Sequence, residues 1–231
     1  MKKRVALCFS GQPRALDEGY HFHYKNIIEP NYSSYKIDVF FHTWTCDQVK
    51  KFIELYCPIS FLTEPSIRMN QPLEFGKRYG YHSLVSEAYS CHQSILLKRA
   101  EEAYLGFRYD YVIKSRTDFA VNVPIFLDQL DLTRIYITDI GYNGSVVHPS
   151  FIVGNSRDMD QVCSYINNIE PESYRTESRW LSTEDVLFNH LNQTGLIQKV
   201  VLFHHPNPFP AGRYNSTPHS IIRDDMHLWS R

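Results

Sequence analysis

The chain has 231 residues, with 24 Lys and Arg against 25 Asp and Glu, so its net charge is close to zero. A chain of this length can form one full α/β domain that buries roughly 70–75% of the surface exposed in the unfolded state, without disulfides or a structural metal. The charge balance argues against a general nucleic-acid-binding protein. No stretch approaches the ~20 consecutive apolar residues that cross a bilayer, so we expect no membrane span.

The five cysteines show neither a CxxC pair nor the spacing of a zinc finger. This pattern is typical of reduced intracellular thiols. The apolar run Val5–Phe9 is too short for the hydrophobic region of a signal peptide, and Gly11–Arg14 interrupts it. We therefore expect a cytoplasmic protein.

Short apolar runs alternate with amphipathic stretches through the first half of the chain. The apolar runs are typical of buried strands, and the amphipathic stretches are typical of helices packed on one face. The expected strands are 4–9, 37–42, 59–62 and 109–115, and the expected helices are 15–28, 46–56 and 83–104. Residues 64–81 carry Pro and Gly without a clear period, which favours a surface loop.

The helix expected over 83–104 has the clearest amphipathic pattern. Its apolar positions, such as Leu84 and Ile95, follow one helical face. Lys98 and Glu102 are expected on the solvent side. Gly106 is a typical residue for the C-terminal end of a helix.

The alternation continues in the second half. We expect strands at 134–138, 150–153 and 198–203, and helices at 158–166 and 183–191, with Ser182 or Thr183 as the N-cap of the last helix. The residues after His204 are interpreted as a closing loop. This order predicts an α/β fold with a mostly parallel central sheet, helices on both faces, and a single domain over 1–231.

In such a sheet the carboxyl ends of the strands line the ligand crevice. The first expected strand ends in Ser10-Gly11-Gln12-Pro13-Arg14. Gly11 lets the backbone approach a ligand closely, and Arg14 near a helix start can bind a phosphate. The stretch lacks the patterns of a P-loop and of a dinucleotide-binding turn. A plain tight turn is the alternative.

The second strand ends at His42 and Trp44. The Trp44 ring can stack on a base or a sugar, and His42 can hydrogen-bond the same ligand. The alternative is an aromatic cap that simply packs against the sheet.

The strand 109–115 leads directly into Arg116 and Asp118. Charged groups left unpaired in a sheet interior are costly, so both are expected at the crevice. A guanidinium suits a phosphate, and a carboxylate suits a divalent cation. The alternative is an ordinary surface loop with a local ion pair.

Glu184 and Asp185 open the helix expected at 183–191. Either carboxylate can serve as a general base aimed into the crevice, and simple helix capping is the alternative. His205 and His219, near the C-terminus, can fold back as nitrogen ligands of a metal ion. For both histidines the alternative is a plain surface residue.

Taken in order, these features resemble the small glycosyltransferases of the GT-A fold, of the viral and bacterial polysaccharide type. The stretches that carry the resemblance are Val5–Gly11, Ser115–Asp118, Phe151–Asn155 and Thr183–Leu187, and they extend over residues 4 to about 205. In that family the first strand and its loop hold a nucleotide-sugar. An Asp-x-Asp motif carries a divalent metal, an acidic pair opens a later helix, and a histidine near the C-terminus often completes the metal shell.

The resemblance implies a Rossmann-like GT-A fold with a nucleotide-binding part over 1–118 and an acceptor-side part over 119–231. It implies transfer of a sugar from a nucleotide diphospho-sugar, with UDP favoured, to a glycan or another hydroxyl acceptor. Asp118, with His205 or His219, would hold Mn²⁺ or Mg²⁺, and Asp185 or Glu184 would act in catalysis. The residues that would bind the donor are Ser10, Gly11, Gln12, Arg14, His42, Trp44, Arg116 and Asp118.

One position departs from the family pattern, because Arg116 stands where the motif has its first acid. The substitution weakens a metal site, or the arginine neutralises the diphosphate directly. Asp139 is a reserve candidate for the missing acid or for the base. Two other functions stay open: another α/β group transferase that clamps anions with Arg14 and Arg116, and a nucleotide- or glycan-binding protein without turnover.

Overall fold

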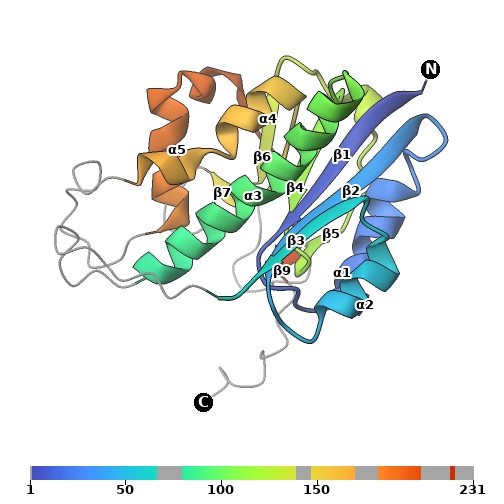
Figure 1. The fold of residues 1–231 in the computed structure, drawn as a ribbon. Helices are drawn as coiled ribbons and strands as arrows, with labels where there is room; N and C mark the ends of the chain where they lie inside the picture. The colour runs from blue at the N-terminus through green and yellow to red at the C-terminus, as the bar shows by residue number, and fades with distance from the viewer. Residues whose placement is uncertain (1, 67–79, 139–146, 170–181, 204–218, 222–231) are drawn as a thin grey trace, which may run out of the picture.

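A seven-stranded sheet forms the centre of the computed structural model, which describes residues 2–66, 80–138, 147–169, 182–203 and 219–221. The strand order across the sheet is β3-β2-β1-β4-β7-β6-β8 (Figure 1). The strands are β1 (Lys3–Ser10), β2 (Tyr35–Trp44), β3 (Ser60–Glu64), β4 (Tyr111–Ser115), β6 (Ile135–Thr138), β7 (His148–Gly154) and β8 (Val200–Phe203).

Six of these strands run in the same direction, and β7 alone runs against its two neighbours, β4 and β6. From β1 the chain moves outward through β2 to β3, and it then returns to place β4 on the other side of β1. The strand order therefore reverses between β1 and β4, and ligands of open α/β sheets bind at the carboxyl ends of the strands at such a point. The prediction of a mostly parallel sheet is confirmed.

Helices cover both faces of the sheet, as predicted. One face carries α1 (Leu16–His23), the π-helical turn η1 (Tyr24–Ile28) and α2 (Val49–Tyr56). The other face carries α3 (Tyr81–Leu105), α4 (Ser156–Val162) and α5 (Thr183–Gln193), as Figure 1 shows.

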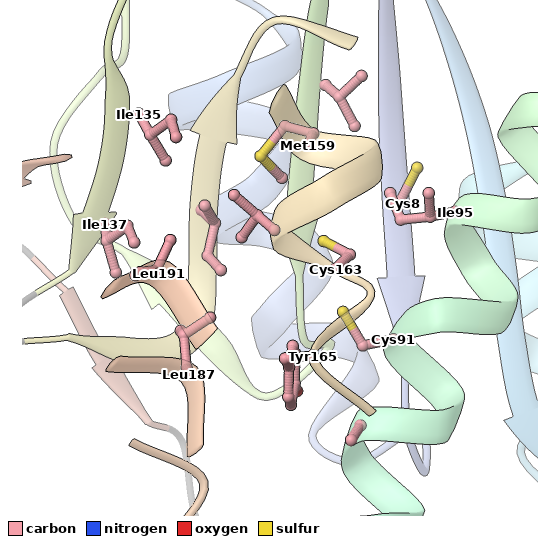
Figure 2. Close-up of a cluster of buried hydrophobic side chains, with 14 of the residues drawn as sticks. Cys8, Cys91, Ile95, Ile135, Ile137, Met159, Cys163, Tyr165, Leu187 and Leu191 are labelled. Atoms are coloured by element: carbon pink, nitrogen blue, oxygen red, sulfur yellow. The ribbon is translucent and has the colours of Figure 1, made fainter. Parts of the chain in front are cut away.

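Side chains of β1 alternate between two cores. Val5, Leu7 and Phe9 point to the α1–α2 side, whereas Ala6 and Cys8 point to the α3–α5 side. All five are fully buried, which explains the continuous apolar run in the sequence. Figure 2 shows the α3–α5 core, in which helix residues pack against the strands.

The charged residues in the second half of α3 differ from the sequence prediction. Lys98 and Glu102 are buried, not solvent-facing. The Lys98 Nζ group donates to Glu102 Oε2 at 3.0 Å, to Ser156 Oγ at 2.6 Å and to Asp160 Oδ1 at 2.6 Å. Because α4 lies over this part of α3, the amphipathic pattern of α3 alone could not identify these residues as buried.

A second, two-stranded sheet was not predicted. It pairs β5 (Phe119–Val121), directly after Asp118, with β9 (His219–Ile221) in antiparallel register. Part of the segment expected as a closing loop is therefore a strand. Three residues are too few for a periodic signal, and the partner lies far away in sequence.

In the described part of the chain, no helix has both the length and the apolar character needed to cross a bilayer.

Candidate functional site

Polar and charged side chains gather where β1 and β4 end, and we call this region the switch-point edge. It comprises Ser10–Arg14, Lys114–Asp118, Glu87 on α3, and Glu184 at the start of α5. The strands β1 and β4, the helices α3 and α5, and the loops after β1 and β4 contribute to it, in accordance with the reversal of strand order at this place.

The loop after β1 is held on both sides by hydrogen bonds from its backbone. The Gly11 N–H donates to Ser90 Oγ on α3 at 2.7 Å, and the Arg14 N–H donates to Thr117 Oγ1 at 3.0 Å. Gly11 has a φ of 91°, a left-handed conformation that glycine adopts at little cost. The side chains of Gln12 and Arg14 are exposed, so the loop presents a cation next to the turn after β4.

His42 supports this loop through Ser90, the residue to which Gly11 donates. Its Nε2 atom lies 2.8 Å from Glu64 Oε2, and its Nδ1 atom lies 2.8 Å from Ser90 Oγ. Burial lowers the pKa of His42, whereas the hydrogen bond from His42 lowers the pKa of Glu64. A neutral ring that donates to the Glu64 carboxylate accepts from Ser90 at Nδ1.

The arrangement Glu64–His42–Ser90 resembles the order of a hydrolytic triad, but Ser90 is fully buried and also accepts from Gly11. A catalytic serine must reach its substrate. We therefore assign these groups to positioning the Ser10–Arg14 loop. The His42 ring, predicted to contact a ligand, is committed to protein partners.

Trp44 is almost entirely buried and stacks on Tyr89, with ring centroids 5.6 Å apart and planes 15° apart. The Tyr89 hydroxyl donates to Glu64 Oε2 at 3.0 Å. The face of the Trp44 ring thus packs against another side chain of the fold, which agrees with the alternative of a packed aromatic cap.

Arg116 and Asp118 pair with each other. Arg116 Nε donates to Asp118 Oδ1 at 2.8 Å and Nη2 donates to Oδ2 at 2.5 Å, which is a bidentate arrangement. Asp118 is buried, and the side chain of Arg116 keeps about a quarter of its surface exposed (26%). Burial alone would lower the pKa of Arg116, but the paired carboxylate outweighs it and the pKa is raised.

A second buried histidine supports the end of β4 from the opposite face. His23 Nε2 lies 3.1 Å from Ser115 Oγ, and Nδ1 lies 2.8 Å from the Tyr56 hydroxyl. Burial lowers the pKa of His23 to about 3. The helix α1 approaches the same turn so closely that a Cβ on Gly19 would lie 1.8 Å from the Thr117 carbonyl oxygen. Nothing in the sequence around a single helical histidine indicates this role.

The start of α5 separates the two predicted acids. Ser182 is the N-cap: its Oγ accepts from the Asp185 N–H at 3.1 Å and donates to Asp185 Oδ2 at 2.7 Å. Glu184 instead forms an ion pair with His148 at 3.0 Å. Burial would raise the pKa of Glu184, but the hydrogen bond from His148 outweighs it and the pKa is lowered.

Lys114 and Glu87 were not predicted as site residues. Lys114 is fully buried, with Nζ 3.7 Å from Glu87 Oε1 and a hydrogen bond to the Pro149 carbonyl. Thr183 at the start of α5 donates to Glu87 Oε2 at 3.1 Å, so Glu87 connects β4 to α5. A lysine inside the apolar strand 111–115 is the one signal in the sequence that points to this pair.

The metal site implied by the GT-A resemblance does not form from the described residues alone. Both Asp118 oxygens accept from Arg116, and no group of three His, Cys, Asp or Glu side chains with metal-binding geometry occurs among the residues that the structure describes. His205 and Asp139 lie outside the described residues. His219 lies on β9, opposite Val121, and its side chain is not among those described.

No protein-family model matches the chain, and no curated protein is significantly similar to it. The function is therefore inferred from the side chains of the switch-point edge.

Proposed function

We propose that the protein is a glycosyltransferase of the GT-A type, which moves a sugar from a nucleotide diphospho-sugar to a hydroxyl group of a glycan or another acceptor. A UDP-sugar is the favoured donor. One observation carries the proposal: two arginines, Arg14 and Arg116, and an ionised, half-buried carboxylate, Glu184, belong to one ligand-binding edge of an α/β sheet.

The diphosphate would lie against the Ser10–Arg14 loop. Arg14 is exposed there, and the guanidinium of Arg116 is partly exposed in the neighbouring turn. When the bond between the sugar carbon and the diphosphate oxygen breaks, its electron pair stays with the leaving diphosphate. Fixed cations aimed at that developing charge lower the barrier. No step is assigned to a metal ion, because the described residues do not form a site for one.

Glu184 is the carboxylate that best fits a general base. Its lowered pKa keeps it ionised at neutral pH, and His148 fixes its orientation. The acceptor hydroxyl would form the new bond to the sugar carbon while its proton passes to Glu184. If the enzyme retains the configuration of the sugar, Glu184 instead positions the sugar. Asp185 is not assigned this role, because its carboxylate accepts from the hydroxyl of the N-cap residue Ser182.

The bidentate pairing of Arg116 with Asp118 favours a second candidate, a nucleotide- or glycan-binding protein without turnover. In this arrangement the guanidinium already has an anionic partner. Slow hydrolysis of the donor in the absence of an acceptor separates the two candidates, because only the transferase cleaves the donor. A different anion-clamping group transferase would bind nucleoside phosphates without discriminating between sugars.

A thermal-shift and calorimetric screen tests the proposal with UDP, GDP and CMP, their sugars, and manganese present or absent. We expect stabilisation by one nucleoside diphosphate and its sugar. Growth of the effect with manganese would assign Asp118 a metal-binding role, whereas no metal effect would assign charge neutralisation to Arg116 and Arg14. No stabilisation by any of these ligands would contradict the transferase.

A further inference from the structure

The buried lysine near the end of β4 connects several elements of the fold. Lys114 is fully buried, and its Nζ group donates to the Pro149 carbonyl on β7 and lies 3.7 Å from Glu87 Oε1 on α3. Thr183, the first residue of α5, donates to Glu87 Oε2 at 3.1 Å. A buried ammonium group is costly unless it is paired and hydrogen-bonded. These contacts satisfy the ammonium group, and they also join β4 to β7, to α3 and, through Glu87, to α5.

The same contacts reach the proposed base from two sides. His148 directly precedes Pro149 in β7, and its Nε2 atom lies 3.0 Å from Glu184 Oε1. Glu184 directly follows Thr183 in α5. The contacts therefore form a closed network, the Lys114 network, whose members are Lys114, Pro149, His148, Glu184, Thr183 and Glu87.

An irregularity in the pairing of β6 with β7 places His148 within reach of α5. Ile137 of β6 pairs with Ile152, but the next residue, Thr138, pairs with His148. A regular antiparallel register advances by one residue on each strand, so residues 149–151 are extra on β7 and form a bulge. Bulges bend a strand and redirect its side chains. The carbonyl group that accepts from the buried lysine belongs to this bulge, so the lysine holds it in place.

Hydrogen bonds on both nitrogens of the imidazole ring define the role of His148. The Ser150 N–H donates to His148 Nδ1 at 3.2 Å, so Nδ1 is the acceptor and Nε2 carries the hydrogen. The Nε2–H group then donates to the Glu184 carboxylate. Because Nδ1 accepts from the backbone, the ring does not pass a proton from Glu184 to another group. His148 is a fixed donor to Glu184 and not a proton relay.

This donor also affects the charge of Glu184. Burial would raise the pKa of Glu184, and the hydrogen bond from His148 is the largest contact that lowers it. The other titratable groups of the Lys114 network are Glu87 and Lys114. Asp185, in the same turn as Glu184, is bonded to the N-cap hydroxyl. The position of the imidazole ring therefore matters both for the orientation of the base and for its ionisation.

We propose that Lys114 is a positioning residue for sugar transfer, which fixes the bulge of β7 and thereby the donor, His148, that orients the Glu184 carboxylate. This inference rests on the proposed function, because Glu184 is the base assigned there. Lys114 acts only through other residues: it is fully buried and contacts no substrate.

Lys114→Met tests the inference, because it removes the ammonium group and keeps a long side chain. We expect the acid limb of the pH profile of kcat to move up by about one pH unit, since Glu184 loses the donor that keeps it ionised. We expect turnover at pH 7 to fall roughly tenfold, with KM for the donor within about twofold of the wild type. Lys98→Met is the matched control. Lys98 is also fully buried and paired, but it joins α3 to α4, so the pH profile of the folded variant should not move.

Variants of His148 test the route by which the lysine acts. In His148→Gln an amide nitrogen can replace Nε2 as the donor, so the acid limb should stay close to its wild-type position. His148→Leu has no donor and should move the limb as far as Lys114→Met does. Adding Lys114→Met to His148→Leu should give no further shift, because the two residues act in series. If Lys114→Met does not fold, the two single variants of His148 decide the outcome.

A carbon-13 NMR titration of the Glu184 carboxylate measures the same pKa without any substrate, and Glu184→Gln identifies the signal. The wild-type group should titrate below its ordinary value, and the group in Lys114→Met about one unit higher. An unchanged Glu184 pKa in Lys114→Met and in His148→Leu, or fully additive shifts in the double variant, overturns the inference and leaves the transferase proposal standing. The expected shifts in a protein that cleaves and transfers no sugar would overturn the proposed function and leave the Lys114 network as an established contact.

Discussion

Asp118 is held by Arg116, two residues earlier in the chain, and each of its carboxylate oxygens accepts one hydrogen bond from the guanidinium. The pair lies in the turn that follows β4 and fixes the position of the guanidinium there. The sequence of this Arg-x-Asp motif predicts ligands for a metal ion or a phosphate. In the fold, its arginine and aspartate form an ion pair with each other.

Asp118→Ala should abolish sugar transfer and also cost stability. The variant leaves a half-buried guanidinium without its partner, so we expect the free energy of unfolding to fall by about 1–3 kcal/mol. Turnover should drop by at least about 100-fold, because Arg116 loses its orientation towards the leaving group. Urea unfolding and a donor-cleavage assay measure the two effects. Asp131→Ala, at an exposed turn, is the control and should leave turnover unchanged. Normal turnover by Asp118→Ala would show that the Arg116–Asp118 pair is not part of the active site.

Stability should fall in acid because of His23. Its pKa is about 3 in the folded protein, against 6.5 as its ordinary value. Between these two pH values His23 binds a proton in the unfolded chain but not in the folded chain. The contribution of His23 to the free energy of unfolding is therefore fully present above pH 6.5 and is lost as the pH falls towards 3. We expect a loss of about 2 kcal/mol by pH 5 from this residue.

Urea unfolding at pH 7.5 and pH 5 checks this in wild type and in His23→Gln. The variant should lose less stability between the two pH values than the wild type does. His21→Gln serves as the control, because His21 is exposed on the same helix. An equal loss of stability in wild type and His23→Gln would show that His23 is not the acid-sensitive group.

Gly19→Ala should destabilise the protein although alanine favours helices by about 1 kcal/mol. The added Cβ would lie 1.8 Å from the Thr117 carbonyl oxygen, and a backbone atom cannot move aside locally. We expect a net loss of about 2 kcal/mol and reduced donor affinity, because α1 must shift against the turn that holds Arg116. Gly154→Ala should be milder, because its Cβ would meet side-chain atoms alone among its nearest neighbours: the flexible Met159 at 3.2 Å and Ile135 at 3.7 Å. A neutral or stabilising Gly19→Ala would contradict the close approach.

Substitutions of the two acids in the first turn of α5, Glu184 and Asp185, should have different effects. Glu184→Gln should lower turnover by about 10²–10⁴-fold with little change in donor affinity, as expected for a lost general base. Asp185→Asn should cost about 1 kcal/mol of stability through its N-cap contacts and leave turnover nearly intact. Steady-state kinetics together with thermal unfolding distinguish these effects. If Asp185→Asn loses the turnover instead, the base is Asp185.

Lys98→Met should be among the most destabilising substitutions on α3 while leaving donor binding unchanged in the folded fraction. The variant leaves Glu102 and Asp160 without the ammonium group to which both are hydrogen-bonded. Loss of one partner from a buried ion pair typically costs about 3–5 kcal/mol. Chemical unfolding measures the loss. The exposed pair of Lys50 and Glu54 provides the control: Lys50→Met should have little effect.

The sequence predicts the sheet and its major helices because their signals are local. The apolar run of β1 and the amphipathic face of α3 need no knowledge of the partner elements. The direction of β7 and the pairing of β5 with β9 depend on distant segments, and no local pattern encodes them. For the site, strand ends identify Arg116 and Asp118, but the partners of Lys114 and His42 come from α3 and β3. Only the folded chain brings those groups together.

The pairing of β5 with β9 also bears on how the protein is made. Residues 119–121 follow the Arg116–Asp118 turn directly, yet their partner strand is residues 219–221. Closing so long a loop is an entropic cost that must be met before the contact yields any stability, so the pairing is expected to form late. During synthesis β9 is the last of these strands to be made, because residues 219–221 follow β8, which ends at Phe203. A nascent chain can therefore form its main sheet before the β5 strand, which lies beside the candidate site, is paired with β9.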